Sequence, residues 1–155
     1  LMMRMSHPAI YELGFSAGAE WLIEDMYTLY GLTVTLEDDK SFEGMDIRVR
    51  VLLFQCLREL LVNVAKHSGV NQAHVRLLSH NGEFRVEVED HGRGVELDKL
   101  GKHSECGFGL FAIRERLHNL RGHIEIRSAP GAGALVVLSV PSQNKQDGTS
   151  TNSLS

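Results

Sequence analysis

The sequence has little cysteine and no long apolar run, and each shortage excludes a class of protein. Its two cysteines, Cys56 and Cys106, are too few for a disulfide framework and are typical of a reducing compartment. No apolar run approaches the roughly 18 residues that a membrane-spanning helix needs, and no signal peptide opens the chain. We therefore expect a cytoplasmic protein. The abrupt opening "LMMRMSHPAIYELG" indicates a piece of a larger protein, which could itself be membrane-anchored.

An excess of positive charge is also missing. The formal net charge of -4 over 155 residues argues against a nucleic-acid-binding protein, which would present a broad cationic surface. A composition of 43% hydrophobic and 23% charged residues is ordinary for one globular domain. The stretch "SQNKQDGTSTNSLS" at 142–155 contains one apolar residue, and we expect it to be a disordered tail.

Helical and strand patterns alternate along the rest of the chain. They predict helices over 17–30, 46–66 and 109–120, a strand in "LTVTLEDD", a hairpin about Asn81-Gly82, and two closing strands in "HIEIRS" and "ALVVLSVP". Gly31 is the expected stop of the first helix, and Asp46 the expected N-cap of the second. Because adjacent strands are mostly joined by hairpins, this order predicts a two-layer α/β sandwich.

The long helix places polar residues together on one face. At about 100° per residue, Glu59, Asn63 and Lys66 share a narrow stripe, with His67 at its margin and leucines on the opposite arc. A solvated surface is the simpler interpretation of such a stripe. Asn63 argues against it, because asparagine is unfavourable in the middle of a helix. An amide oxygen beside a carboxylate and an ammonium group would suit Mg²⁺ and phosphate.

Asp90 ends the strand "EFRVEVED" on its apolar side. Alternation with period two places it in line with Phe84, Val86 and Val88. It could simply cap the following turn. A carboxylate at the rim of a core is equally suited to accept a hydrogen bond from an exocyclic amine, and would then orient a ligand in an apolar pocket.

Two pairs of glycines flank a polar interval after this strand. Gly92 and Gly94 precede it, and Gly107 and Gly109 follow it, so the backbone there can approach a flat ring or a phosphate. Residues 107–110 would open the next helix and offer free N–H groups to a polyphosphate. The interval itself would act as a lid. A Rossmann motif is excluded because "GFGLFA" does not follow a strand, and a Walker loop because no Gly-Lys-Ser/Thr is present.

Together and in this order, four motifs resemble the ATP-binding catalytic domain of two-component sensor histidine kinases, in the GHKL superfamily. "ELLVNVAKHS" is similar to its N box, and "EDHGRG", "GFGLFAIRERL" and "SAPGAGALVVLSVP" to its three glycine boxes. "HPAIYELGFSAGAEWL" is similar to the segment after the dimerisation helices in the subfamily with NarL- or LuxR-type regulators. The resemblance implies a Bergerat fold, a mixed sheet with about three helices on one face. It also implies a division into 1–31, the end of the dimerisation region with the first helix, 32–141, the ATPase domain, and the tail 142–155.

The resemblance also assigns roles to the candidate residues. It makes Asn63 a ligand of Mg²⁺ and Glu59 the acid that polarises water or a metal-bound group. It makes Asp90 the reader of the adenine amino group, flanked by Gly92 and Gly94. The groups it places near the phosphates are Lys66, His67, Gly107, Gly109 and the N–H of Leu110.

ATP and Mg²⁺ are the implied cofactors, and the implied reaction moves the γ-phosphoryl group to a histidine on a separate dimerisation domain. A response-regulator receiver domain would take it next. We expect the chain alone to be monomeric and its full-length parent to be a homodimer. Ala134 departs from the family's threonine, which leaves a degenerate nucleotide-sensing or protein-interaction module as the alternative. A different GHKL ATPase or serine kinase is a nearer rival.

Overall fold

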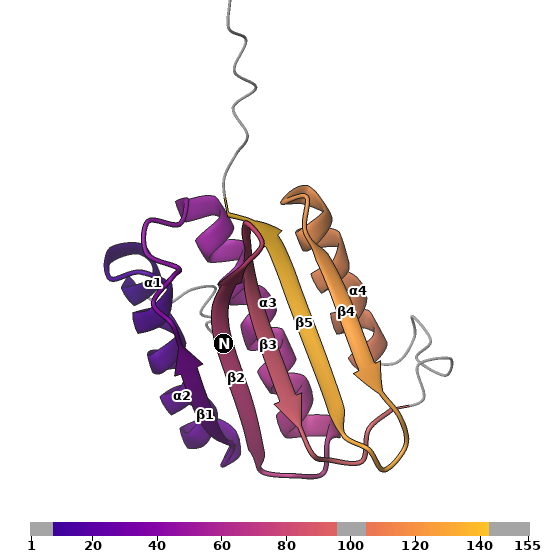
Figure 1. Ribbon diagram of the computed structural model, residues 1–155. Coiled ribbons are helices and arrows are strands. Elements are labelled where there is room, and N and C mark those ends of the chain that lie inside the picture. The colour runs from indigo at the N-terminus through magenta and orange to yellow at the C-terminus, as the bar shows by residue number, and fades with distance from the viewer. Residues whose placement is uncertain (1–7, 96–104, 143–155) are drawn as a thin grey trace, which may run out of the picture.

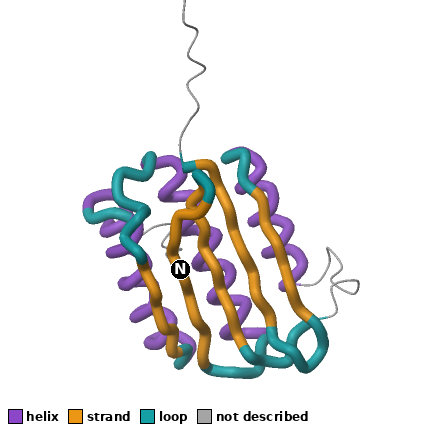
Figure 2. Tube along the Cα trace, viewed as in Figure 1, coloured by secondary structure: helices purple, strands orange, loops and turns teal. Residues whose placement is uncertain are grey.

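The computed structural model describes residues 8–95 and 105–142 and forms two layers. Five strands make one sheet, and the long helices all lie against the same face of it (Figure 1). Figure 2 shows the helices behind the strands, with the loops gathered at the two ends of the sandwich. This arrangement confirms the predicted α/β sandwich. The predicted tail and most of the predicted lid interval lie outside the described residues.

The sheet is mixed, with strand order β1-β2-β3-β5-β4. Its strands are β1 (Thr33–Asp38), β2 (Gln72–His80), β3 (Glu83–Asp90), β4 (His123–Ser128) and β5 (Ala134–Pro141). Strand β1 runs parallel to β2, and every other neighbouring pair is antiparallel. The parallel pair needs a long crossover, and the chain between these two strands provides it as a helix.

Four helices are described, and recognisable signals mark the end of the second and the start of the third. They are α1 (Pro8–Glu12), α2 (Phe15–Tyr30), α3 (Ile47–His67) and α4 (Glu105–Asn119). Helix α2 ends at Gly31, whose φ of 67 is the left-handed conformation predicted for a helix stop. Helix α3 begins after Asp46, whose side chain accepts a hydrogen bond from the N–H of Arg48 at 2.9 Å. Both predictions are confirmed.

Helix α4 begins earlier than the sequence predicts. The expected start was Gly109, whereas the helix runs from Glu105. The reason is that glycine has a low helix propensity, so Gly107 and Gly109 appear in the sequence to precede the helix. Tertiary packing overrides this propensity, because the next turns bury Ile113 and Leu117 in the core.

One hydrophobic core joins the two layers. Ile10 of α1 and Phe15 and Leu22 of α2 are fully or almost fully buried in the same cluster as the inner residues of α3 and of the sheet. The two N-terminal helices therefore pack as part of the sandwich. The proposed division of the chain at residue 31 stays a prediction about the parent protein.

The hairpin between β2 and β3 has the predicted turn. Asn81 and Gly82 have φ angles of 50 and 74, the pair of positive values that a type I′ turn requires. The turn sets the register so that Val75 lies opposite Val88, with both side chains buried. The same alternation turns Phe84, Val86 and Val88 inward and carries Asp90 with them.

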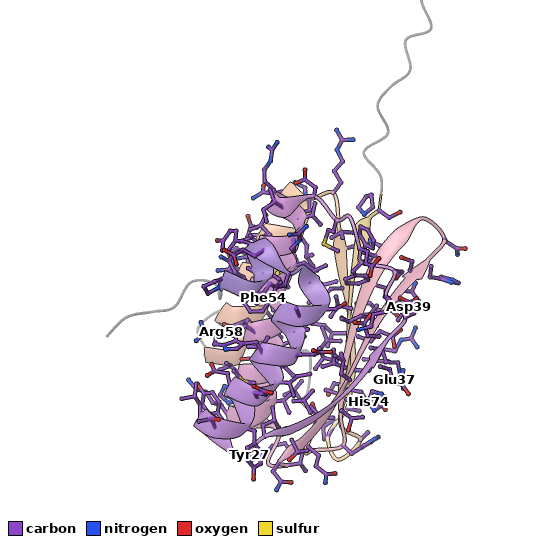
Figure 3. All side chains as sticks on the ribbon, turned by 90° about the vertical axis from the view of Figure 1, so that its left-hand side faces the viewer. Tyr27, Glu37, Asp39, Phe54, Arg58 and His74 are labelled. Atoms are coloured by element: carbon purple, nitrogen blue, oxygen red, sulfur yellow. The ribbon has the colours of Figure 1, made fainter. Side chains whose placement is uncertain are left out.

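The other face of the sheet carries charged side chains and no helix (Figure 3). Arg76 is at its centre, with nitrogen atoms 3.1 Å from Glu37, 2.9 Å from Glu87 and 3.4 Å from Glu89. The hydrogen bond to Glu87 raises the pKa of the Arg76 guanidinium above its ordinary value, and the charges of all three carboxylates add to the effect. These ion pairs make this face of the sheet polar.

Candidate functional site

A pocket lies at the end of the sandwich where α3 and β3 end and β5 begins. Figure 1 shows these ends of the three elements at its lower edge. Its walls come from both layers, and most of them are apolar. The lining residues are Leu60, Asn63, Val64, His67, Ser68, Val88, Asp90, Gly94, Val95, Leu110, Ile126, Ala134 and Val136. An apolar cleft with a few convergent polar groups is the usual form of a small-molecule site.

Asp90 is the acidic group of this pocket. It is 7% exposed at the end of β3, and its Oδ1 accepts a hydrogen bond from the N–H of Gly92 at 2.9 Å. That bond fixes the plane of the carboxylate. Asp90 therefore presents a fixed carboxylate to the pocket, where it can accept a hydrogen bond from a ligand.

Asn63 and His67 line the pocket from one face of α3. The Nδ2 of Asn63 and the Nε2 of His67 are both buried, and neither has a hydrogen-bond partner among the described residues. Buried polar atoms are normally satisfied, so an unpartnered pair in one pocket indicates a site shaped for a polar ligand. The amide of Asn63 also carries an oxygen, which is the kind of ligand that Mg²⁺ prefers.

The glycines after β3 allow backbone segments to pack against one another. A Cβ on Gly92 would overlap the carbonyl oxygen of Ser68, and one on Gly94 would overlap that of Ala129. Gly133 in the next turn would overlap the carbonyl oxygen of Asp90 in the same way. Gly94 and Gly133 also have φ angles of 64 and 72, which L side chains rarely adopt. These glycines hold the loop after β3 between the end of α3 and the β4–β5 turn.

The pocket brings together Asn63, His67, Asp90, Gly94 and Leu110 from the predicted set. Gly92 joins them through its bond to Asp90. The remaining four candidates, Glu59, Lys66, Gly107 and Gly109, do not line it.

Two of these four meet at the α3–α4 contact. A Cβ on Gly109 would overlap the carboxylate of Glu59, so glycine permits the close approach of α4 to α3. Because α4 begins at Glu105, the N–H groups of Gly109 and Leu110 lie beyond its first four residues and take part in the helical hydrogen bonds. Lys66 lies on the exposed side of α3.

Two serines contribute to the site without having been predicted. Ser68 is buried at the end of α3, where its hydroxyl donates to the carbonyl of Val64 at 2.6 Å. Ser128 ends β4 and bonds to two backbone segments. Serine directly after a helix or strand is common, so the sequence alone gave no reason to select either residue.

Cys56 lies on α3 near Glu59 and is fully buried. Burial raises the pKa of its thiol to about 11, which Arg116 opposes and Glu59 reinforces. The thiol is therefore protonated near neutral pH and has no nucleophilic role. Among the described residues, no group of three or more His, Cys, Asp or Glu side chains could hold a metal ion. Within the same residues, no helix is both long and apolar enough to cross a membrane.

Solved structures share this fold. The blue-light activated histidine kinase of Erythrobacter litoralis EL346 superposes with a TM-score of 0.72 at 18% identity, covering 86% of this chain and 43% of that one. The Acinetobacter baumannii histidine kinase AdeS superposes with a TM-score of 0.69 at 20% identity, covering 84% of this chain and 66% of that one. At such identities the likeness shows the fold.

Curated relatives are sensor kinases. The signal transduction histidine-protein kinase/phosphatase DegS of Brevibacillus brevis is 28% identical over 133 residues, which make up 86% of this chain and 34% of that protein. The sensor histidine kinase LiaS of Bacillus subtilis is 30% identical over 122 residues, 72% of this chain and 33% of that protein. The chain thus spans about a third of the length of these relatives.

A family model matches residues 48–144, which include α3, β2 to β5 and the whole pocket. Its description is histidine kinase-, DNA gyrase B- and HSP90-like ATPase. The matched region is more than half of the chain and contains all four of the motifs that carried the resemblance. The chain therefore belongs to the family of histidine kinase-, DNA gyrase B- and HSP90-like ATPases.

Proposed function

We propose that this chain is the ATP-binding catalytic domain of a sensor histidine kinase, and that it transfers the γ-phosphoryl group to a histidine on a separate dimerisation domain. The observation that carries the proposal is the position of Asp90. Its fixed carboxylate lines an apolar pocket, and two further polar groups of that pocket, Asn63 and His67, come from the opposite layer. The membership of the family and the sensor-kinase relatives support the same function.

Adenine is the part of the nucleotide that Asp90 would bind. An ionised carboxylate only accepts hydrogen bonds, so it favours the amino group of adenine over the oxo group that guanine has at the same ring position. The apolar walls of the pocket, such as Val88 and Val136, suit the faces of a flat ring. Asp90 would therefore select the base, and the walls would bury it.

The phosphates would extend from this pocket towards the exposed side of α3. Asn63 and Glu59 would hold a Mg²⁺ ion, and the amide oxygen of Asn63 is the kind of ligand that Mg²⁺ prefers. When bound, the ion neutralises charge on the phosphate oxygens. His67 and Lys66 would donate hydrogen bonds to the phosphates from the last turn of the helix. Binding by the N–H groups of Gly109 and Leu110 would require the first turns of α4 to open.

The partners follow from the function. The acceptor histidine would lie on the dimerisation domain of a homodimeric parent protein, and a response-regulator receiver domain would take the phosphoryl group from it. We propose no nucleic-acid partner, because a net charge of -4 implies no broad cationic surface.

Transfer to a separate acceptor tests the proposal. The chain is incubated with γ-labelled ATP, MgCl₂ and the dimerisation domain of its parent protein, and label on the acceptor histidine is counted. We expect Asn63→Ala, which removes the amide oxygen, to reduce the transfer rate by about 100-fold, because one lost transition-state interaction costs about 3 kcal/mol. The exposed Asn71 provides the matched variant, Asn71→Ala, which should transfer normally.

Circular dichroism should show that both variants are folded. Equal transfer by Asn63→Ala and the wild type would contradict the role of Asn63. Ala134 favours a second candidate function, a nucleotide-sensing or interaction module, because the family's threonine is absent there. That candidate predicts nucleotide binding without any transfer by the wild type.

A further inference from the structure

One hydroxyl group joins the loop after β3 to the turn between β4 and β5. The Oγ of Ser128 accepts a hydrogen bond from the N–H of Val95 at 2.9 Å. The same Oγ donates to the carbonyl oxygen of Gly133 at 2.8 Å. A serine hydroxyl has one proton to donate, and this pair of bonds uses it together with one acceptor site. Ser128 therefore connects two backbone segments that are distant in sequence.

Besides the bond from the N–H of Gly92 to the Asp90 carboxylate, backbone hydrogen bonds hold the loop between Asp90 and Val95. The N–H of Arg93 donates to the carbonyl of Ser68 at 2.8 Å, and the carbonyl of Arg93 accepts from the N–H of Gly131 at 2.7 Å. These bonds fix the middle of the loop. The bond to Ser128 then holds the backbone at Val95.

Ser128 stands in register with the acidic group of the pocket. Asp90 pairs with Ala134 across β3 and β5, and Ala134 pairs with Ser128 across β5 and β4. The three residues form one row across the sheet. Ser128 does not line the pocket, whereas Gly94 and Val95 do. Its hydroxyl therefore contacts the pocket only indirectly, through the hydrogen bond that it accepts from the N–H of Val95.

The position of Ser128 would otherwise favour an apolar side chain. It follows Ile124 and Ile126 on the strand face that packs against the core. A hydroxyl on such a face is unfavourable unless it is hydrogen-bonded. Both hydrogen bonds of Ser128 go to backbone segments that frame the pocket. The hydroxyl therefore influences the shape of the pocket through these two segments.

We propose that Ser128 is a positioning residue for the nucleotide pocket: by bonding to Val95 and Gly133, it holds the wall formed by Gly94 and Val95 in the shape that binds the nucleotide. This inference rests on the proposed function, because it requires an adenine nucleotide in the pocket. Ser128 does not contact the nucleotide. The loss of its hydroxyl should therefore weaken binding in a protein that remains folded.

The test is the affinity for ADP in the presence of MgCl₂, measured calorimetrically well below the unfolding temperature of each variant. We expect Ser128→Ala to bind ADP about fivefold more weakly, the change that corresponds to one net hydrogen bond. Ser128→Thr keeps the hydroxyl and should bind within about twofold of the wild type. If Ser128→Ala fails to fold, Ser128→Cys replaces it, because its weakly bonding thiol fills the space and should also weaken binding.

Ser142 provides the matched control. Its hydroxyl donates to a glycine carbonyl, that of Gly82, at 2.8 Å, but at the opposite end of the sheet (Figure 1). Ser142→Ala should leave the affinity for ADP unchanged. Amide hydrogen exchange adds a local measurement: the N–H of Val95 should exchange faster in Ser128→Ala and keep its protection in Ser128→Thr.

Three negative results would contradict the account at different points. If the wild type binds ADP and Ser128→Ala binds it equally well, the inference is wrong, even if the variant melts at a lower temperature. If Ser128→Thr loses as much affinity as Ser128→Ala, the hydroxyl is not responsible and the inference is again wrong. If the folded wild type binds no ADP, the proposed function fails, and the inference fails with it.

Discussion

Asp90 and Ala134 are cross-strand partners at the ends of β3 and β5, and both line the same pocket. The side chain beside the carboxylate of Asp90 is therefore a single methyl group. The family that the sequence resembles usually has threonine there, with a hydroxyl that helps to hold a water molecule by the base. Alanine in place of threonine at position 134 should therefore lower the affinity of the pocket for the nucleotide.

Ala134→Thr should strengthen nucleotide binding. One added hydrogen bond is worth about 1 kcal/mol, so the dissociation constant of ADP should fall about fivefold in a calorimetric titration. Ala134→Val is the matched variant, because valine has the shape of threonine without the hydroxyl. Equal effects of the two substitutions would show that the added volume, and not the hydrogen bond, changes the affinity.

Gly133→Ala should destabilise the fold more than Gly131→Ala. Both glycines have positive φ angles, 72 and 75, so alanine is strained at either position by about 1 kcal/mol. Only the Cβ at Gly133 meets a neighbour, the carbonyl of Asp90, whereas nothing lies within 4 Å of the Cβ at Gly131. That overlap should cost about 2 kcal/mol more.

Urea unfolding, followed by circular dichroism, measures the two free energies of unfolding. The difference between the variants isolates the contact with Asp90, because the backbone strain is common to both. If Gly131→Ala proved as damaging as Gly133→Ala, the interlocking of the glycine loop with the β4–β5 turn would not be a source of stability.

Cys56 should resist alkylation in the folded protein. It is fully buried and its pKa is raised to about 11, so about 0.1% of the thiol is ionised at pH 8. In a Cys106→Ser variant, iodoacetamide should modify Cys56 at least about 100-fold more slowly in buffer than in urea, as measured by mass spectrometry. Similar rates in both solutions would contradict the packing of α3 against α4.

The same thiol should make stability depend on pH. Its pKa rises from an ordinary value of 9.0 to about 11 on folding. Between these values the folded chain keeps the proton and the unfolded chain loses it, so this group lowers the free energy of unfolding as the pH rises from 9 to 11. Cys56→Ala should make that decline shallower, which denaturant titrations at several pH values would measure.

Local chemistry was enough to predict most of the elements. The stop at Gly31, the cap at Asp46 and the turn at Asn81-Gly82 each depend on residues a few positions apart, and all three are confirmed. Alternation along β3 likewise placed Asp90 on the buried side. Such features are predictable because a short stretch of sequence contains both partners of each interaction.

The parts that could not be predicted depend on contacts between distant segments. The start of α4 was placed too late because packing, and not propensity, decides where its glycines belong. The bond between Ser128 and Val95, and the fit of Gly94 against Ala129, join segments whose proximity follows only from the order of strands in the sheet. The roles of individual site residues towards the nucleotide stay predictions.

The most direct test of the central claim is a calorimetric titration of ADP, with MgCl₂, into the wild type and into Asp90→Asn. The substituted amide oxygen can still accept the N–H of Gly92, so the loop should stay in place while the carboxylate is lost. We predict saturable binding to one site in the wild type and a loss of at least about tenfold in Asp90→Asn. No binding to the folded wild type at millimolar ADP, or equal binding by both proteins, would contradict the account.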